Sequence, residues 1–433
     1  MELRGMKWSM RRKPRRPLNP WRVMVLLLLI AFGVYLNQVV VPTLPSPFVP
    51  TPTPTPNPEA VMNEARRLFA QGKLARAIET YQGAILADPR NPALFIELAR
   101  VQMLSGAVEA SLTSAQNALL LNPNNPQALT WQAWALHRLG RTEEALVAVR
   151  QALEADPNLG LAHAVYAEIL ADQGNYTRAD EEIRTALDLA PNSMEVHAVY
   201  GYVLYVESYL ERAAKEYQQA IAGNKYIPEW HLQLGLIYRL LGQRQGDPAL
   251  LDQAIEEFLT ANTLDPPNPL PDTYIARTYA ALGEFGKALQ YAADAVQEAP
   301  TDPYMHGNYG VMLYKNGKYA EAVRELALVV HGGLTADGVT VEGLPLDYGR
   351  VAEYYFTYGW ALLRLRRCDE AVPIFQAILN TIPADQISVE NAQAGLKTCR
   401  ELALTPQPNL TGTPEGTPAP GETTPTPTPT PQP

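Results

Sequence analysis

The residues of this chain that are best suited to chemistry are its six histidines and two cysteines. Four histidines, His163, His197, His231 and His306, occupy equivalent positions of repeated segments, and the first three lie 34 residues apart. Imidazole is a common zinc ligand, but its nitrogen must lie about 2.1 Å from the ion. Equivalent positions of stacked helices lie about 10 Å apart. We therefore interpret the histidines as products of repeat duplication, with a metal site as the alternative.

Sequence motifs for catalysis are missing from the chain. It contains no nucleophile elbow, HExxH motif, P-loop or dinucleotide-binding fingerprint. The formal net charge of −10 argues against a general nucleic-acid binder, which would need a basic face. We predict no enzymatic activity, no cofactor, no metal, no nucleic-acid partner and no evident small-molecule substrate.

The middle of the chain repeats one helical unit. Prolines 89, 123, 157 and 191 recur every 34 residues, as do glycines 72, 106, 140 and 174. Each unit has two apolar stripes at helical spacing, separated by a glycine-containing turn and closed by a proline. Small residues recur at two further positions of each unit. Positions are counted from the first residue of each unit. The residues at position 8 are Ala65, Ala99, Ala133, Ala167, Gly201, Gly235, Ala276, Gly310 and Gly359. The residues at position 20 are Ala77, Ser111, Ala145, Ala179, Ala213, Ala254, Ala288, Ala322 and Ala371.

This pattern resembles the tetratricopeptide repeat (TPR) family, and the matching units cover most of the chain. The resemblance implies an all-α, right-handed α-solenoid of about nine repeats over residues 58–385, with a capping helix at 386–403. Two departures from the repeat pattern are expected to change the solenoid locally. A seven-residue insertion at 243–249 provides Asp247 as a cap for a lengthened helix, and the glycine-rich segment 331–349 is compatible with a small hairpin or a tolerated insertion.

The resemblance also implies a protein-binding groove formed by the first helix of each unit. Family positions carried over onto this chain select aromatic, arginine and other side chains typical of binding hot spots. They are Arg66, Phe69, Arg100, Met103, Trp134, His137, Tyr202, Tyr205, Arg239, Arg277, Tyr304, Tyr314, Phe356 and Trp360. The positions that clamp a chaperone carboxylate in some family members hold other residues here. An extended peptide or a partner helix with apolar anchors is the expected ligand. Packing between helices is the alternative role.

The two cysteines fall at the end of the predicted array. Cys368 begins the second helix of the ninth unit, and Cys399 lies 31 residues later in the capping helix. Because the start of one helix faces the end of the next in an antiparallel stack, we predict a disulfide that holds the cap, in an oxidising compartment. Buried free thiols are the alternative.

The front of the chain predicts a membrane anchor. Residues 23–41 carry no charge, and a helix formed by this stretch would be about 28 Å long. Residues 1–22 contain eight Lys or Arg and one acidic residue, which predicts a cytoplasmic N-terminus and an extracytoplasmic array. A cleaved signal peptide, a buried core helix and the reversed topology are the alternatives.

Two Thr/Pro-rich segments flank the array. Residues 42–57 are predicted to be an extended linker, and residues 404–433 a disordered tail. The whole chain is interpreted as a scaffold at the cytoplasmic membrane of the cell envelope that binds other proteins. A stalked structural or adhesion protein at the cell surface is the principal alternative, and an enzyme-associated subunit is a second.

Overall fold

The computed structural model describes residues 19–40 and 58–404. Contacts divide the chain between residues 57 and 58 into two units, which are described separately. Three predictions lie outside the described residues: most of the basic tail at 1–22, the linker at 42–57, and the tail at 404–433 except for its first residue.

The first unit is an apolar helix. Helix α1 (Pro20–Tyr35) continues into a short π-helical segment, η1 (Leu36–Val40). The side chain of Asn19 accepts a hydrogen bond from the Trp21 amide, and Pro20 is pre-organised for the first helical position, so the helix begins before residue 23. The stretch Pro20–Val39 has a mean hydropathy of 1.9, is entirely exposed, and is long and apolar enough to cross a membrane. A signal sequence shares these properties.

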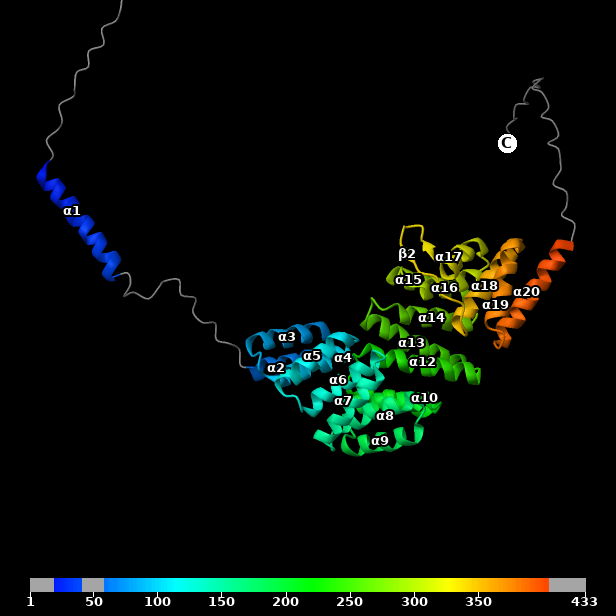
Figure 1. Ribbon diagram of the computed structural model, residues 1–433, viewed down its shortest axis with the longest axis horizontal. Helices are drawn as coiled ribbons and strands as arrows, with labels where there is room; N and C mark the ends of the chain where they lie inside the picture. The colour runs from blue at the N-terminus through cyan, green and yellow to red at the C-terminus, as the bar shows by residue number, and fades with distance from the viewer. Residues whose placement is uncertain (1–18, 41–57, 405–433) are drawn as a thin grey trace, which may run out of the picture. The chain divides into compact units, whose positions relative to one another are not determined.

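The second unit consists of consecutive helix pairs (Figure 1). We number the pairs as repeat units 1 to 9. They are α2 (Pro58–Ala70) with α3 (Leu74–Ala87), α4 (Pro92–Leu104) with α5 (Val108–Leu121), α6 (Pro126–Arg138) with α7 (Thr142–Ala155), α8 (Gly160–Asp172) with α9 (Tyr176–Leu189), α10 (Met194–Val206) with α11 (Leu210–Gly223), α12 (Pro228–Gln245) with α13 (Pro248–Leu264), α14 (Pro269–Ala281) with α15 (Phe285–Glu298), α16 (Pro303–Lys315) with α17 (Tyr319–His331), and α18 (Arg350–Arg364) with α19 (Cys368–Thr381). A last helix, α20 (Gln386–Leu404), packs on α18 and α19. The predicted all-α solenoid is confirmed.

The turn between the two helices of a pair requires a residue in the left-handed backbone conformation. Gly140, between α6 and α7, has φ +75°, a conformation that costs glycine nothing. Units 5 and 9 lack this glycine, yet Ser208 and Arg366 adopt the same conformation, with φ of 67° and 61°. The turn geometry is therefore kept at a local backbone cost where the sequence pattern departs from glycine.

Small residues let the two helices of a pair approach closely. The position-20 residues Ala77, Ala145 and Ala213 are completely buried. A Cβ atom added to Gly235 in α12 would lie 2.6 Å from the ring of Phe258 in α13, which is itself completely buried. Helix packing at these distances leaves no room for a larger side chain.

Both predicted departures from the repeat are confirmed. The insertion lengthens α12 to 18 residues and α13 to 17, and Asp247 caps α13 by accepting a hydrogen bond from the Ala249 amide at 2.9 Å. The segment after α17 forms a two-stranded antiparallel hairpin of β1 (Gly333–Leu334) and β2 (Thr340–Val341).

The capping helix is held by packing and by a covalent bond. Cys368, the first residue of α19, forms a disulfide with Cys399 of α20, with their Cα atoms 5.6 Å apart. Gly395 of α20 lies against the ring of Phe375. The apolar face of unit 9 is thus covered by α20, as a solenoid end requires.

Candidate binding surfaces

The first helices of the units line one side of the array, and in units 1 to 6 they also meet across it. Arg100 of α4 and Glu195 of α10 form an ion pair at 2.7 Å, although they are 95 residues apart. The amide of Asn224, between units 5 and 6, donates a hydrogen bond to the carbonyl of Phe69 in unit 1 at 3.4 Å. The inner surface of these units is therefore partly closed by contacts between distant repeats.

This closure corrects the groove prediction at Phe69, Met103 and Trp134. All three are buried, at 7 to 8% exposure, instead of lying on an open face. Leu98 of unit 2 and Trp230 of unit 6 belong to one apolar cluster, which fills the space that an open groove would leave. The side chain of His137 is equally buried.

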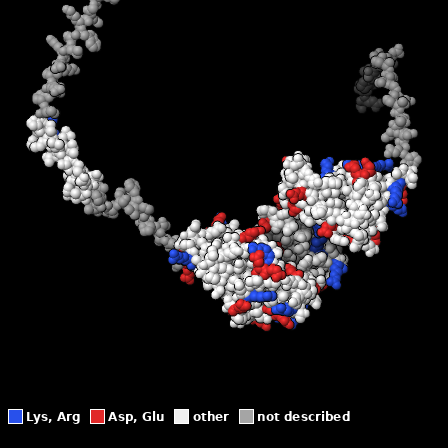
Figure 2. Space-filling view, in the orientation of Figure 1, with Lys and Arg blue, Asp and Glu red and all other residues white. Residues whose placement is uncertain are grey.

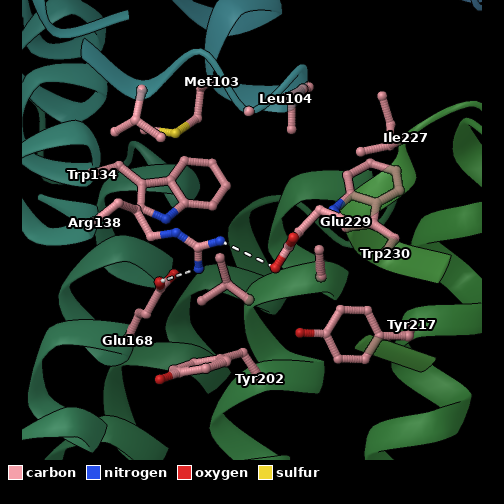
Figure 3. A pocket seen from close by; sticks show the side chains of 14 residues that line it. Met103, Leu104, Trp134, Arg138, Glu168, Tyr202, Tyr217, Ile227, Glu229 and Trp230 are labelled. Atoms are coloured by element: carbon pink, nitrogen blue, oxygen red, sulfur yellow. Dashed lines mark hydrogen bonds and ion pairs between the residues drawn. The ribbon is translucent and has the colours of Figure 1, made fainter. Parts of the chain in front are cut away.

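A small pocket that contains an ion-pair cluster remains inside this region (Figure 3). Its volume is about 80 Å³, enough for a few water molecules but not for a peptide. The guanidinium of Arg138 lies between two carboxylates, 3.5 Å from Glu168 and 3.3 Å from Glu229. The wall is largely aromatic and apolar, and includes Met103, Trp134, Tyr202, Tyr217 and Trp230.

In the pocket, one guanidinium faces two carboxylates. Burial raises the pKa of Glu168, and the neighbouring Arg138 opposes that rise. Burial lowers the pKa of Arg138, but Glu168 and Glu229 more than compensate, so its net pKa lies above the ordinary value. The contacts of Arg138 with the buried Glu168 and with the partly exposed Glu229 connect helices of different units. We therefore interpret Arg138 as a residue that joins units 3, 4 and 6.

Other predicted groove residues meet through an acidic residue that the sequence pattern did not select. Asp172, the last residue of α8, lies 2.9 Å from Nε2 of His137 and accepts a hydrogen bond from the Tyr202 hydroxyl at 2.7 Å. The ring of Tyr205 lies 6.5 Å from that of Tyr202. The three predicted residues form one cluster at the inner ends of units 3 to 5.

A wider cavity opens among units 1 to 5. Its volume is about 440 Å³, and its apolar lining includes Ile96. Its charged lining is a chain of ion pairs: Arg66 with Glu97 at 2.7 Å, Arg100 with Glu97 at 3.8 Å, and Arg100 with Glu195. The predicted residues Arg66 and Arg100 thus face a cavity, but each already has a carboxylate partner.

The predicted aromatic residues of units 8 and 9 remain accessible. Tyr304 is 42% exposed, and a cavity of about 280 Å³ is lined by Tyr314, Phe356 and Trp360. The lining also includes Arg364, which the repeat pattern did not select although it lies one helical turn after Trp360. The indole N–H of Trp360 is buried without a hydrogen-bond acceptor. This surface offers apolar contact area and one unused donor.

Two further predicted residues lie deeper on the inner side. Arg239 of α12 is half-buried, and the side chain of Arg277 in α14 is 17% exposed. Arg350, at the first position of α18, shares a hydrogen-bond partner, Asn308, with Arg277. The repeat pattern missed Arg350 because it is the first residue of unit 9, directly after the glycine-rich segment.

The histidine series has a common structure. In each case Nδ1 meets a glutamate from the second helix of the same unit, at 2.6 to 2.7 Å, and Nε2 donates to the carbonyl six residues earlier. The glutamates are Glu182, Glu216, Glu257 and Glu325. Within residues 19–40 and 58–404, no group of three or more His, Cys, Asp or Glu is placed to hold a metal ion. These histidines tie helix pairs together.

Charge on the visible face of the array is mixed. Figure 2 shows acidic and basic side chains interspersed among uncharged ones, without a broad area of one sign. In α1, Arg22 is the one charged residue. Mixed charge of this kind is typical of solvated helix faces.

The repeats match known families. Residues 68–135 and 136–201 match one tetratricopeptide repeat model, and residues 275–331 match a second. The chain is a tetratricopeptide repeat protein, and this class of α-solenoid generally acts as a scaffold for protein–protein interaction. No catalytic family is among the matches. No curated protein sequence matches at a significant level.

Solved structures share the fold at low identity. The Cut9–Hcn1 hetero-tetramer of the APC/C aligns with a TM-score of 0.53 and 14% identity, over 78% of this chain and 55% of that one. The chain thus spans about half the length of that relative. A human IFIT1 dimer with PPP-AAAA aligns with a TM-score of 0.52 and 18% identity, over 79% of this chain and 82% of that one. Pseudomonas aeruginosa pilF aligns with a TM-score of 0.40 and 21% identity, over 62% of this chain and 96% of that one.

Proposed function

We propose that this protein is a membrane-anchored scaffold that binds partner peptides or helices along the inner face of units 6 to 9. The observation that carries the proposal is the accessible aromatic surface of α16 and α18, where Tyr304 is exposed and a cavity of about 280 Å³ is lined by Tyr314, Phe356 and Trp360. Aromatic side chains around a concavity are the usual anchors of a protein interface. The closed inner surface of units 1 to 6 serves as a rigid support.

We further propose that α1 is an uncleaved anchor and that the array lies outside the cytoplasm. The apolar stretch is 20 residues long and follows a basic segment. The Cys368–Cys399 disulfide supports the same location, because disulfides persist mainly in oxidising compartments. A reporter fused to the C-terminus tests the orientation. The intact mass of the membrane-bound protein tests cleavage, since an uncleaved chain keeps residues 1–41.

The groove is tested by crosslinking and pull-down from membranes. The variant combines Tyr314→Ala and Phe356→Ala, and its matched control combines Tyr176→Ala and Tyr209→Ala, two exposed tyrosines away from the inner face. We expect at least a tenfold loss of captured partner for the first variant and no loss for the control. Equal capture by both variants would contradict the groove proposal.

The alternative is a stalked structural or adhesion protein at the cell surface. It is favoured by the Thr/Pro composition of residues 404–433, which resembles surface stalks. Protease treatment of intact cells separates the two: a surface-exposed array is digested, whereas an array enclosed within the envelope is protected.

A further inference from the structure

Two arginines from different repeat units share one neutral side chain, and a third arginine lies near them. Arg277 of α14 and Arg350 of α18 both donate hydrogen bonds to Oδ1 of Asn308 in α16, at 3.0 and 3.2 Å. The two guanidinium groups therefore share a single amide oxygen. Arg239 of α12 lies close enough for the charges of Arg277 and Arg350 to act on it.

The negative charge available to these arginines is insufficient. Glu353 lies 3.2 Å from Nη2 of Arg277, and within the described part of the chain neither Arg239 nor Arg350 has a carboxylate within ion-pair distance. Burial lowers the pKa of Arg239 to about 10, and repulsion from the other two arginines adds to the effect.

Unused hydrogen-bond donors occur at the same place. The Nε–H groups of Arg239 and Arg277 are buried and have no acceptor within the described residues. Burying a charged donor without a partner is costly, and buried donors are almost always satisfied. The contrast with Arg138 is direct, because that guanidinium has two carboxylates, Glu168 and Glu229, within ion-pair distance.

The forked guanidinium group matches the oxygen spacing of carboxylates and phosphates, and binds them with two hydrogen bonds. We propose that Arg239, Arg277 and Arg350 form an oxyanion-binding site that receives a carboxylate or phosphate group of the bound partner protein. This inference rests on the proposed function and adds a charged contact to it. An anion there would supply the acceptors and the charge that the three side chains lack.

The site is continuous with the aromatic surface. Glu353, which contacts Arg277, lies on α18 three residues before Phe356 and seven before Trp360, and this spacing keeps all three on one face of the helix. A partner that anchors apolar side chains against Phe356 and Trp360 would therefore carry its anionic group a few residues away.

The test uses the full chain in detergent and follows thermal unfolding. Inorganic phosphate, acetate and chloride are compared at equal ionic strength. The variant is Arg239→Gln, and the matched control is Arg244→Gln, an exposed arginine of the same helix. Phosphate also stabilises proteins nonspecifically, so the difference between the variants is the readout.

We expect phosphate, acetate or both to raise the melting temperature of the wild type and of the control by about 2 °C more than that of Arg239→Gln. A response to phosphate alone indicates a phosphorylated partner, and a response to acetate an acidic side chain or terminus. In chloride, Arg239→Gln should melt at or above the wild-type temperature, because it removes a repelling charge. Equal shifts in all three proteins, or no shift in the wild type, would overturn the site. No partner is present in this measurement, so it is independent of the pull-down.

Discussion

The repeated histidines show how single residues stabilise the helix pairs. At His163, the hydrogen bond to Glu182 raises the pKa of the imidazole. At His306, burial lowers the pKa, but Glu325 and the Pro300 carbonyl raise it more, so the net pKa is raised. A raised folded-state pKa gives stability that is complete below about pH 6.5 and is lost as the pH rises through the folded value.

Replacing His306 with Gln should therefore destabilise the protein more at pH 6 than at pH 8.5. Glutamine can make only one of the two hydrogen bonds and carries no charge, so we expect a loss of about 1–2 kcal/mol at pH 6. Urea unfolding at the two pH values measures this loss of unfolding free energy. The control is His331→Gln, an exposed histidine. Equal losses at both pH values would exclude a contribution from charge.

Asp272 is a buried carboxylate that destabilises the protein at neutral pH. Burial, with repulsion from Asp294, raises its pKa to about 6, and burial together with Asp272 and Asp294 raises that of Glu298 to about 7. Stability linked to these groups falls as the pH rises from about 4 to above 7, because the folded state then loses protons that it binds more tightly than the unfolded state.

The variant Asp272→Asn should be more stable than the wild type at pH 8, by about 1–2 kcal/mol, because it removes the buried charge and keeps an acceptor for Asn262. At pH 4.5 the difference should be small, since Asp272 is then protonated. Melting temperatures at both pH values give the result. The control Asp188→Asn, at an exposed residue, should leave the melting temperature unchanged at both pH values. A loss of stability for Asp272→Asn at pH 8 would contradict the prediction.

At the scale of the elements, the close approach of paired helices depends on position 8. Gly235→Ala should cost about 1–3 kcal/mol, because the added methyl group meets the ring of Phe258 at 2.6 Å. Gly83→Ala, in the open surface of α3, should instead stabilise by about 0.5–1 kcal/mol through helix propensity. Urea unfolding compares the two variants. Similar effects for both would show that packing does not control this position.

The capping helix depends on its covalent bond. The Cys368–Cys399 bridge closes a loop of 31 residues and should contribute about 2–4 kcal/mol. Replacing both cysteines with alanine should increase amide exchange in α20 and at the end of α19, while units 1 to 7 keep their protection, because repeat arrays are stabilised by neighbours. Mass spectrometry of unreduced, unfolded protein tests the bond itself. Alkylation of both thiols would disprove it.

At the scale of the whole molecule, charged contacts across the inner surface hold distant units together. Arg100 and Glu195, which is 8% exposed, join units 2 and 5. A double-mutant cycle with Arg100→Met and Glu195→Gln should give a coupling of about 1–3 kcal/mol. The exposed pair Arg141 and Glu144 should give no measurable coupling, because solvent screens it. A coupling near zero for the first pair would indicate that apolar packing alone closes the inner surface.

The sequence predicted the groove less well than the fold. Positions such as Tyr314, Phe356 and Trp360 fell on accessible surface, because side chains at those positions face inward in any such unit. The same positions in units 1 to 3 gave Phe69, Met103 and Trp134, which are buried. The pattern fixes the direction in which a side chain points from its helix, but not what lies opposite it.

The sequence by itself determined the helix pairs, their small-residue contacts, the lengthened sixth unit and the apolar first helix, because each depends on neighbours within about 40 residues. The tertiary structure decided which parts of the inner face are closed. That depends on small rotations between successive units, which accumulate until residues about 90 to 155 positions apart meet. The same accumulation brings Arg239, Arg277 and Arg350 together. No local pattern contains this information, because the charges that face one another belong to different repeats.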